Sequence, residues 1–246
     1  MRKLALLLCL AAAPAAALDL NALTDDERAA FNAQIRAYLL ENPEILVEAM
    51  DVLEDRQAAE QATRDAEAIA ANADALFEDP NSWRGGAEDG DITVVEFLDY
   101  RCGFCKRAHP EVAALLEADP NVTLVVKEYP ILGEASLLAS RFAIATLQVA
   151  GDDSYKLVSD ALMGINGDIT EQTLTRLANT LGLDTDAILE RMDSDAVTEV
   201  IAANHQLAQR MGISGTPSFI MGDQLLRGYA PLARMQAIVE EERSEG

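Results

Sequence analysis

The sequence predicts an α/β domain with a central helical insertion, preceded by an N-terminal helical arm. Short β-prone runs alternate with helical patterns after about residue 90. A long helical pattern fills most of residues 18–78, and several more helical segments separate the second predicted strand from the last two. The chain has 246 residues, of which 50% are hydrophobic, so it is long enough to bury a sizeable core.

Residues 1–17 are predicted to be a secretory signal. A positively charged start precedes an apolar run over residues 4–13, and small residues follow it. The apolar run is too short to span a bilayer comfortably. We therefore expect export of the protein, with cleavage after about Ala17.

Charge and cysteine content narrow the function classes. The formal net charge of −23 argues against nucleic-acid and anionic-membrane partners. The chain has three cysteines, and signal cleavage would remove Cys9 and leave only Cys102 and Cys105. An exported protein with these two cysteines has no structural disulfide framework, so its sulfur chemistry is concentrated at one place.

The arm is predicted over residues 18–78. Thr24 and Glu27 form a capping-box pattern at the start of one helix, and Pro43 stands at the first position of a second. The second pattern continues to about Phe77 without a glycine or an internal proline. This length indicates either homo-oligomerisation through the arm or a solvated, Ala-rich helix, and the sequence leaves both open.

The catalytic domain is predicted over residues 79–246, after a breaker-rich linker at 79–91. The expected strands cover residues 93–98, 122–128, 217–221 and 225–229, and the expected helices cover 103–117, 135–149, 154–163, 171–181, 185–192, 196–211 and 231–242. Removing the helical insertion at about 134–212 leaves strand, helix, strand, strand, strand, helix. This order, with a right-handed crossover, is the thioredoxin-type arrangement.

Cys102-Gly103-Phe104-Cys105 stands where the first long strand passes into a helix. A Cys-x-x-Cys pair in this context is typical of a redox-active dithiol. The dipole and unpaired N–H groups of the helix N-terminus favour a thiolate there. We interpret Cys102 as the attacking thiol and Cys105 as the resolving thiol. The alternatives are half of a metal site or two incidental thiols.

Three segments, residues 97–105, 128–133 and 215–219, resemble the DsbA family of exported thiol:disulfide oxidoreductases. The resemblance covers roughly residues 80–243, and the arm more loosely resembles the ScsC-type branch. It implies a periplasmic location, cysteine-containing exported proteins as substrates, and a membrane redox partner that resets the dithiol. No cofactor is expected.

The resemblance also implies a substrate platform. Pro217 corresponds to a cis proline that faces the dithiol, and Thr216 would present its backbone to an extended substrate. Gly103 and Phe104 would border the same platform. The alternative for Pro217 is an ordinary proline at the start of a strand.

Glu96 stands six residues before Cys102 in the strand pattern. The family places a buried acid at this position, near the resolving cysteine. A desolvated carboxylate there would accept the proton of Cys105 during its attack. The alternative is an exposed glutamate on the strand surface.

His109 follows Cys105 by one helical turn, and this spacing could contribute to a metal site. A residue on the helix surface is the favoured interpretation, and no metal site is predicted. Family members with a histidine beside the nucleophile carry it between the cysteines, where this chain has Phe104. This departure predicts a weaker stabilisation of the thiolate and a less oxidising disulfide than in the strongest oxidants.

The favoured function is protein disulfide exchange. An isomerase or a reductase is the preferred interpretation, and a monomeric oxidase is the alternative within this class. The isomerase hypothesis depends on the arm, because an oligomer could enclose a misfolded substrate between several dithiols. The alternative is a copper- or zinc-binding periplasmic protein that uses the same two thiolates, since soft ligands favour such ions.

Overall fold

A computed structural model describes residues 22–245 of the chain. The predicted signal at residues 1–17, its cleavage site and Cys9 lie outside the described residues. The chain divides into two compact units that meet between Gln57 and Ala58. We describe each unit by itself.

The first unit contains α1 (Asp25–Glu41) and the beginning of α2 (Glu44–Ala71). The predicted capping box is confirmed at the start of α1. The Thr24 hydroxyl accepts a hydrogen bond from the Glu27 N–H, and the Glu27 carboxylate accepts one from the Thr24 N–H at 2.9 Å. No side chain of α1 is buried within its unit.

The prediction of one continuous helix to Phe77 is wrong, because the helix is interrupted at Asn72. This residue has φ −120° and ψ 18°, and α3 (Ala73–Phe77) begins after it. Its side-chain amide donates a hydrogen bond to the Ala68 carbonyl at 2.8 Å and accepts one from the Arg210 guanidinium at 2.6 Å. Asn side chains that bond to nearby backbone compete with helix propagation, which explains the interruption.

The second unit is built on a five-stranded sheet with the order β1-β3-β2-β4-β5. Its strands are β1 (Trp83–Gly86), β2 (Ile92–Leu98), β3 (Val122–Glu128), β4 (Ser218–Met221) and β5 (Gln224–Arg227). Strands β2 and β3 run parallel, and every other neighbouring pair runs antiparallel. The four predicted strands are therefore confirmed within a few residues.

Strand β1 was not predicted, because residues 79–91 have the composition of a linker. It pairs with the edge of β3, and the Trp83 ring stacks on Tyr155 with 5.5 Å between ring centroids. The Trp83 indole also donates to the Asp152 carbonyl at 3.1 Å. Contacts with distant parts of the chain thus define this strand.

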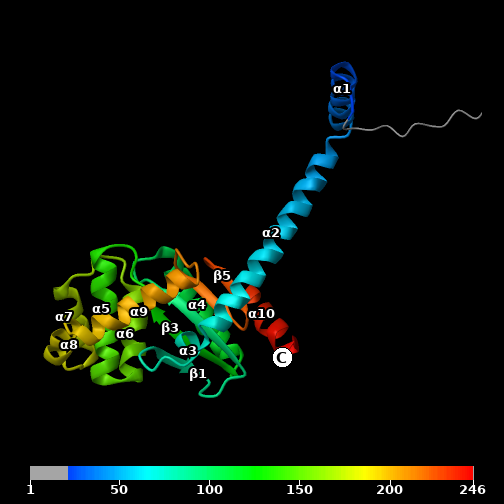
Figure 1. Cartoon of the computed structure of the whole chain (residues 1–246). Coiled ribbons are helices and arrows are strands. Elements are labelled where there is room, and N and C mark those ends of the chain that lie inside the picture. Colours follow the sequence, from blue (N-terminus) through cyan, green and yellow to red (C-terminus); the bar gives the residue numbers. More distant parts are fainter. Residues whose placement is uncertain (1–21, 246) are drawn as a thin grey trace, which may run out of the picture. The chain divides into compact units, whose positions relative to one another are not determined.

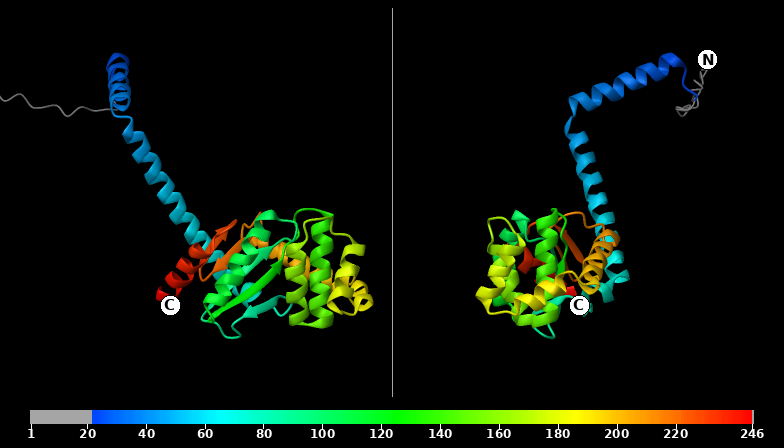
Figure 2. Two further views of the ribbon diagram at one scale, coloured as in Figure 1. Left: turned by 180° about the vertical axis from the view of Figure 1, so that it is seen from behind. Right: turned by 90° about the vertical axis from the view of Figure 1, so that its left-hand side faces the viewer.

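Seven helices complete the second unit: α4 (Gly103–Ala118), α5 (Glu134–Ala150), α6 (Asp152–Gly164), α7 (Glu171–Leu181), α8 (Thr185–Met192), α9 (Asp195–Arg210) and α10 (Leu232–Glu245). Helices α5 to α9 form the predicted insertion between β3 and β4, and α5 to α8 gather beside the sheet (Figure 1 and Figure 2). The predicted fold class, a thioredoxin fold with a helical insertion, is confirmed.

The two faces of the sheet bury separate hydrophobic clusters. One face carries Val94, Leu98, Leu124 and Val126, which pack with side chains of α4, α6 and α10. The other face carries Val95, Phe97 and Val125, which pack with Ile69, Leu76 and Leu207 from α2, α3 and α9. Alternation along β2 assigns Glu96 to the same face as Leu98, beneath α4. Within residues 22–245, no helix is both long and apolar enough to cross a membrane.

Candidate dithiol active site

Cys102 is the N-cap residue of α4. Its N–H donates to the Asp99 carbonyl at 3.0 Å, and its own carbonyl accepts from the Lys106 N–H at 3.1 Å. Its thiol donates to the Thr216 carbonyl at 3.1 Å. Both Cys102 and Cys105 are free thiols. Cys102 therefore lies at the positive end of a 16-residue helix.

Asp99 fixes the turn that leads into Cys102. Its buried carboxylate accepts hydrogen bonds from the N–H groups of Arg101, Ile131 and Leu132 at 2.7, 2.8 and 3.1 Å. It thus joins the loop before the dithiol to the loop after β3. Sequence reasoning gave Asp99 no role, although an aspartate two residues before a turn amide is a recognisable Asx-turn signal.

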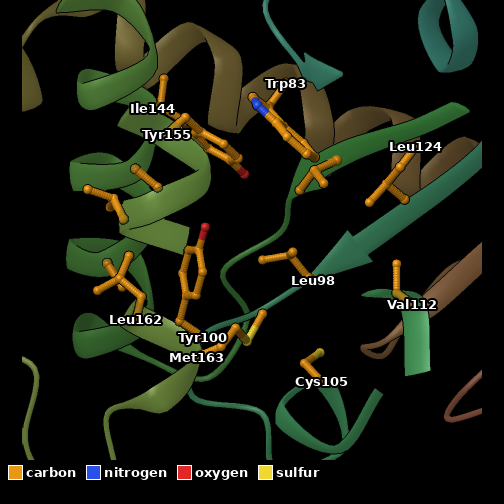
Figure 3. Close-up of a cluster of buried hydrophobic side chains, with 14 of the residues drawn as sticks. Trp83, Leu98, Tyr100, Cys105, Val112, Leu124, Ile144, Tyr155, Leu162 and Met163 are labelled. Carbon is orange, nitrogen blue, oxygen red and sulfur yellow. The ribbon is translucent and has the colours of Figure 1, made fainter. Parts of the chain in front are cut away.

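Cys105 lies one turn inside α4 and is fully buried. It belongs to the hydrophobic cluster that contains Leu98 and Val112 (Figure 3). Burial raises the pKa of its thiol well above the usual range, and the charges of Glu96 and Cys102 raise this pKa further. The two cysteines therefore differ in position, since Cys102 caps α4 whereas Cys105 lies within the helix and strongly resists ionisation.

Glu96 is only 3% exposed, so the structure contradicts the alternative of an exposed glutamate. It faces Val126 of β3 and Phe219 of β4 in the sheet register. Its Oε1 atom is buried and has no hydrogen-bond partner within residues 22–245. Burial, followed by the charge of Glu128, raises the pKa of Glu96 to about 8.

Glu128 is a second buried carboxylate with a different environment. Its Oε1 accepts hydrogen bonds from the hydroxyls of Tyr100 and Tyr155 at 2.7 and 2.6 Å, and its Oε2 accepts one from Ser140 at 2.7 Å. Figure 3 shows the hydroxyl ends of both tyrosines directed toward one another. Burial raises the pKa of Glu128 to about 7, while these hydrogen bonds oppose the rise. Glu128 thus holds a negative charge more readily than Glu96, which favours the proton.

The Glu128 network was not predicted. Its members come from the end of β3, the loop after β2, and helices α5 and α6. No local spacing connects these positions, so a sequence pattern could not have identified them together.

The Thr216–Pro217 peptide bond is cis, as the resemblance implies. The Thr216 carbonyl meets the Cys102 thiol, and the Pro217 carbonyl accepts from the Gly228 N–H at 2.9 Å. A cavity of about 180 Å³ borders this loop along residues 214–218. The structure thus brings the predicted platform residues next to the predicted nucleophile.

Gly103 and Phe104 lie on the surface beside Cys102. The Phe104 ring is 54% exposed, and the Arg107 guanidinium lies 5.2 Å from its centroid. The same guanidinium lies 5.6 Å from the Tyr229 ring. An exposed aromatic ring held by a cation presents an apolar contact surface at the entrance to the dithiol.

His109 does not join the dithiol. Its Nε2 lies 2.9 Å from Asp160 on α6, so the ring is engaged with a carboxylate. Within residues 22–245, no group of three or more His, Cys, Asp or Glu side chains is arranged to hold a metal ion.

Comparisons with protein families match two parts of this chain. A family model described as the DSBA-like thioredoxin domain matches residues 93–240. A model described as the copper resistance protein ScsC N-terminal domain matches residues 27–60. Together these matches cover most of the predicted catalytic domain and part of the predicted arm.

Several solved structures are also similar to this chain. A thioredoxin-like oxidoreductase from Silicibacter pomeroyi is 44% identical, with a TM-score of 0.66, and the match covers 70% of this chain and 97% of that one. ScsC from Proteus mirabilis in a transitional conformation is 28% identical, with a TM-score of 0.67, over 91% of this chain and 100% of that one. Among curated proteins, the Na(+)/H(+) antiporter NhaA 3 of Salinispora tropica is 27% identical over 63% of this chain. The match spans only 24% of that protein's length.

Proposed function

The chain belongs to the family of DSBA-like thioredoxin domains, which are thiol:disulfide oxidoreductases, and we propose that it exchanges disulfides with protein substrates through Cys102 and Cys105. The observation that carries this proposal is the contrast between the two thiols. Cys102 caps a helix, is 7% exposed and contacts the backbone of Thr216, whereas Cys105 is 0% exposed and resists ionisation. A reactive thiol beside a shielded one is what stepwise exchange requires.

Exchange proceeds in two balanced steps. The Cys102 thiolate attacks one sulfur of a substrate disulfide, a mixed disulfide forms, and the other substrate sulfur leaves as a thiolate. Cys105 then transfers its proton to the ionised form of Glu96 and attacks the Cys102 sulfur. The Cys102–Cys105 disulfide forms and the second substrate thiolate leaves. The substrate is reduced and the enzyme dithiol is oxidised, and the reverse sequence oxidises a substrate.

The substrate would bind as an extended segment along Thr216. The loop over residues 214–218 lies against the Cys102 sulfur. The cavity beside this loop leaves room for substrate side chains on either side of the reacting cysteine. The exposed ring of Phe104 would contact apolar residues of the substrate. Gly103 leaves the approach open, since a Cβ atom there would meet nothing within 4 Å.

We further infer that the protein acts after export to the periplasm, with the predicted signal at residues 1–17. Its substrates would be exported proteins that contain cysteines, and a membrane redox partner would reset the dithiol after each cycle. The chain's own two thiols supply the electrons, so the reaction needs no resident cofactor.

Self-association through the arm would suit the protein to isomerase activity. Its described part carries nine large apolar side chains that are exposed within their unit: Phe31, Ile35, Tyr38, Leu40, Leu46, Val47, Met50, Val52 and Leu53. Leaving such side chains in water is unfavourable by about 25 cal/mol per Å² of apolar surface, which favours their burial against other copies of the chain. An oligomer would expose one substrate to several dithiols.

Two substitutions on one face of α2 test this proposal. Leu46 and Leu53 are seven residues apart, so their side chains share a face. The double variant Leu46→Ser/Leu53→Ser is expected to have a smaller native mass in light scattering than the unmodified protein. It should also repair scrambled ribonuclease several-fold more slowly, with simple disulfide reduction unchanged.

The matched control is Leu157→Ser, which alters an equally exposed leucine on α6. This variant should keep the mass and the repair rate of the unmodified protein. A monomeric unmodified protein, or repair that is unaffected in the double variant, would contradict a role for the arm.

A further inference from the structure

A small cavity lies between the buried acid and the surface of the second unit. It has a volume of about 30 Å³. Its lining includes Glu96 from β2, His109 from α4, and Lys156 and Asp160 from α6. The cavity therefore touches a buried carboxyl group at one side and a partly exposed imidazole–carboxylate pair at another.

The remaining walls are mostly apolar, and Figure 3 shows five of them: Trp83, Leu98, Val112, Leu124 and Tyr155. A water molecule needs about 10–15 Å³ of such cavity volume, so the cavity has room for one. Such a water needs two or more polar partners. The Glu96 carboxyl, the Ser159 hydroxyl and the His109 ring all line the space and can supply them.

Glu96 needs a way to lose its proton. In the proposed cycle it accepts a proton from Cys105 only when it is ionised. Because burial raises its pKa to about 8, Glu96 is mostly protonated at pH 7 and must release a proton to solvent before each resolution step. The carboxyl is almost fully buried, and its Oε1 has no protein partner within residues 22–245. Direct exchange with solvent is therefore hindered, and the cavity is the space that leads away from it toward the surface.

His109 is suited to receive this proton. Its Nε2 lies 2.9 Å from the Asp160 carboxylate, so Nε2 carries the hydrogen and Nδ1 is the basic nitrogen. The charged groups that face the ring are Asp160 and Lys156, both on α6. Burial lowers the pKa of His109, and Lys156 lowers it further, while Asp160 opposes the shift. The lowered pKa favours the neutral ring, whose Nδ1 lone pair can accept a proton.

We propose that His109 is the exit of a proton relay, in which a single water in the cavity carries the proton from Glu96 to the imidazole, and Asp160 fixes the ring. The relay rests on the proposed exchange function. Before resolution, Glu96 gives its proton to the water, the water gives one to Nδ1, and the imidazolium releases one to solvent. The Glu96 carboxylate then accepts the Cys105 proton as Cys105 attacks the mixed disulfide. No electrons move along this route.

Rapid mixing of the reduced full-length protein with dithiobis(nitrobenzoate) tests the relay. The attack of Cys102 releases one coloured thiolate, and resolution by Cys105 releases a second, so the two steps are recorded separately. In His109→Ala the first phase should keep its rate, and the second should slow by about tenfold at pH 7. Added imidazole should restore the second phase, because the deleted side chain leaves room for the free base.

The pH profile separates a relay from a structural effect. In His109→Ala the rate of the second phase should keep the pH midpoint that ionisation of Glu96 imposes and should be lower at each pH. The matched control is His205→Ala, which removes the only other histidine of the chain, on α9, and should change neither phase.

The outcomes are distinct. A missing first phase would overturn the proposed function itself. With a normal first phase, the relay is overturned if His109→Ala resolves as fast as the unmodified protein, if imidazole does not restore the rate, or if the pH midpoint moves. Glu96→Gln should slow the second phase in the presence and absence of imidazole, because it removes the group that the relay serves.

Discussion

Replacing Cys102 with serine is expected to lower the rate of disulfide exchange by about three orders of magnitude or more, because a hydroxyl cannot form or resolve a mixed disulfide. Replacing Cys105 with alanine should have a different result. The Cys102 thiol would still attack a substrate disulfide, but the mixed disulfide would persist because its resolving thiol is absent. Reduction of insulin, followed by its turbidity, measures the first effect, and intact mass measures the second.

The pair of variants gives a strong contrast, since only Cys105→Ala should accumulate a covalent enzyme–substrate complex. Thr180→Ala is a control that alters an exposed residue of α7 without removing a sulfur. It should retain exchange. Accumulation of the complex in Cys102→Ser instead would reverse the roles that we propose for the two cysteines.

Replacing Glu96 with glutamine is expected to stabilise the reduced protein as pH rises. Burial raises the pKa of Glu96 to about 8 in the folded state, whereas an unfolded glutamate titrates near 4.5. Between these two pH values the folded protein binds more protons than the unfolded chain, so the carboxyl destabilises the fold progressively with increasing pH. Glutamine has no proton to lose. The variant should therefore gain about 3 kcal/mol at pH 7 relative to its effect at pH 4.

Urea unfolding at several pH values measures this gain. The matched control is Glu117→Gln, which alters an exposed glutamate of α4 and should change the stability little at each of these pH values. If the stability of Glu96→Gln parallels that of the unmodified protein from pH 4 to pH 8, Glu96 is not a buried, proton-binding acid.

The elements that local sequence signals define were predicted well. Strand β3 was expected at residues 122–128 and is found at Val122–Glu128, and helix α7 was expected at 171–181 and is found at Glu171–Leu181. The residues whose pattern defines each of these elements are close together in the sequence. Strand β1 has no such signal, because pairing with β3 and the stacking of Trp83 on Tyr155 define it.

The same distinction between local sequence signals and long-range contacts holds for the candidate site. The cysteine pair and the Thr216–Pro217 motif are short patterns, and the fold brings them together at the Cys102 thiol and the Thr216 carbonyl. The proton-binding environment of Glu96 depends on Glu128 and on a cavity lined from several elements. Such an environment is set by three-dimensional packing, so residue types alone could not specify it.

The account depends most on the claim that Cys102 and Cys105 form one redox couple, with an attacking thiol at the N-terminus of α4 and a more deeply buried partner. Equilibration of the full-length protein in glutathione buffers of graded redox potential, followed by acid quenching and peptide mass analysis, tests this directly. We predict that both thiols are lost together as an intramolecular disulfide, with any glutathione adduct found on Cys102. Two thiols that oxidise independently, or an adduct on Cys105, would contradict the account.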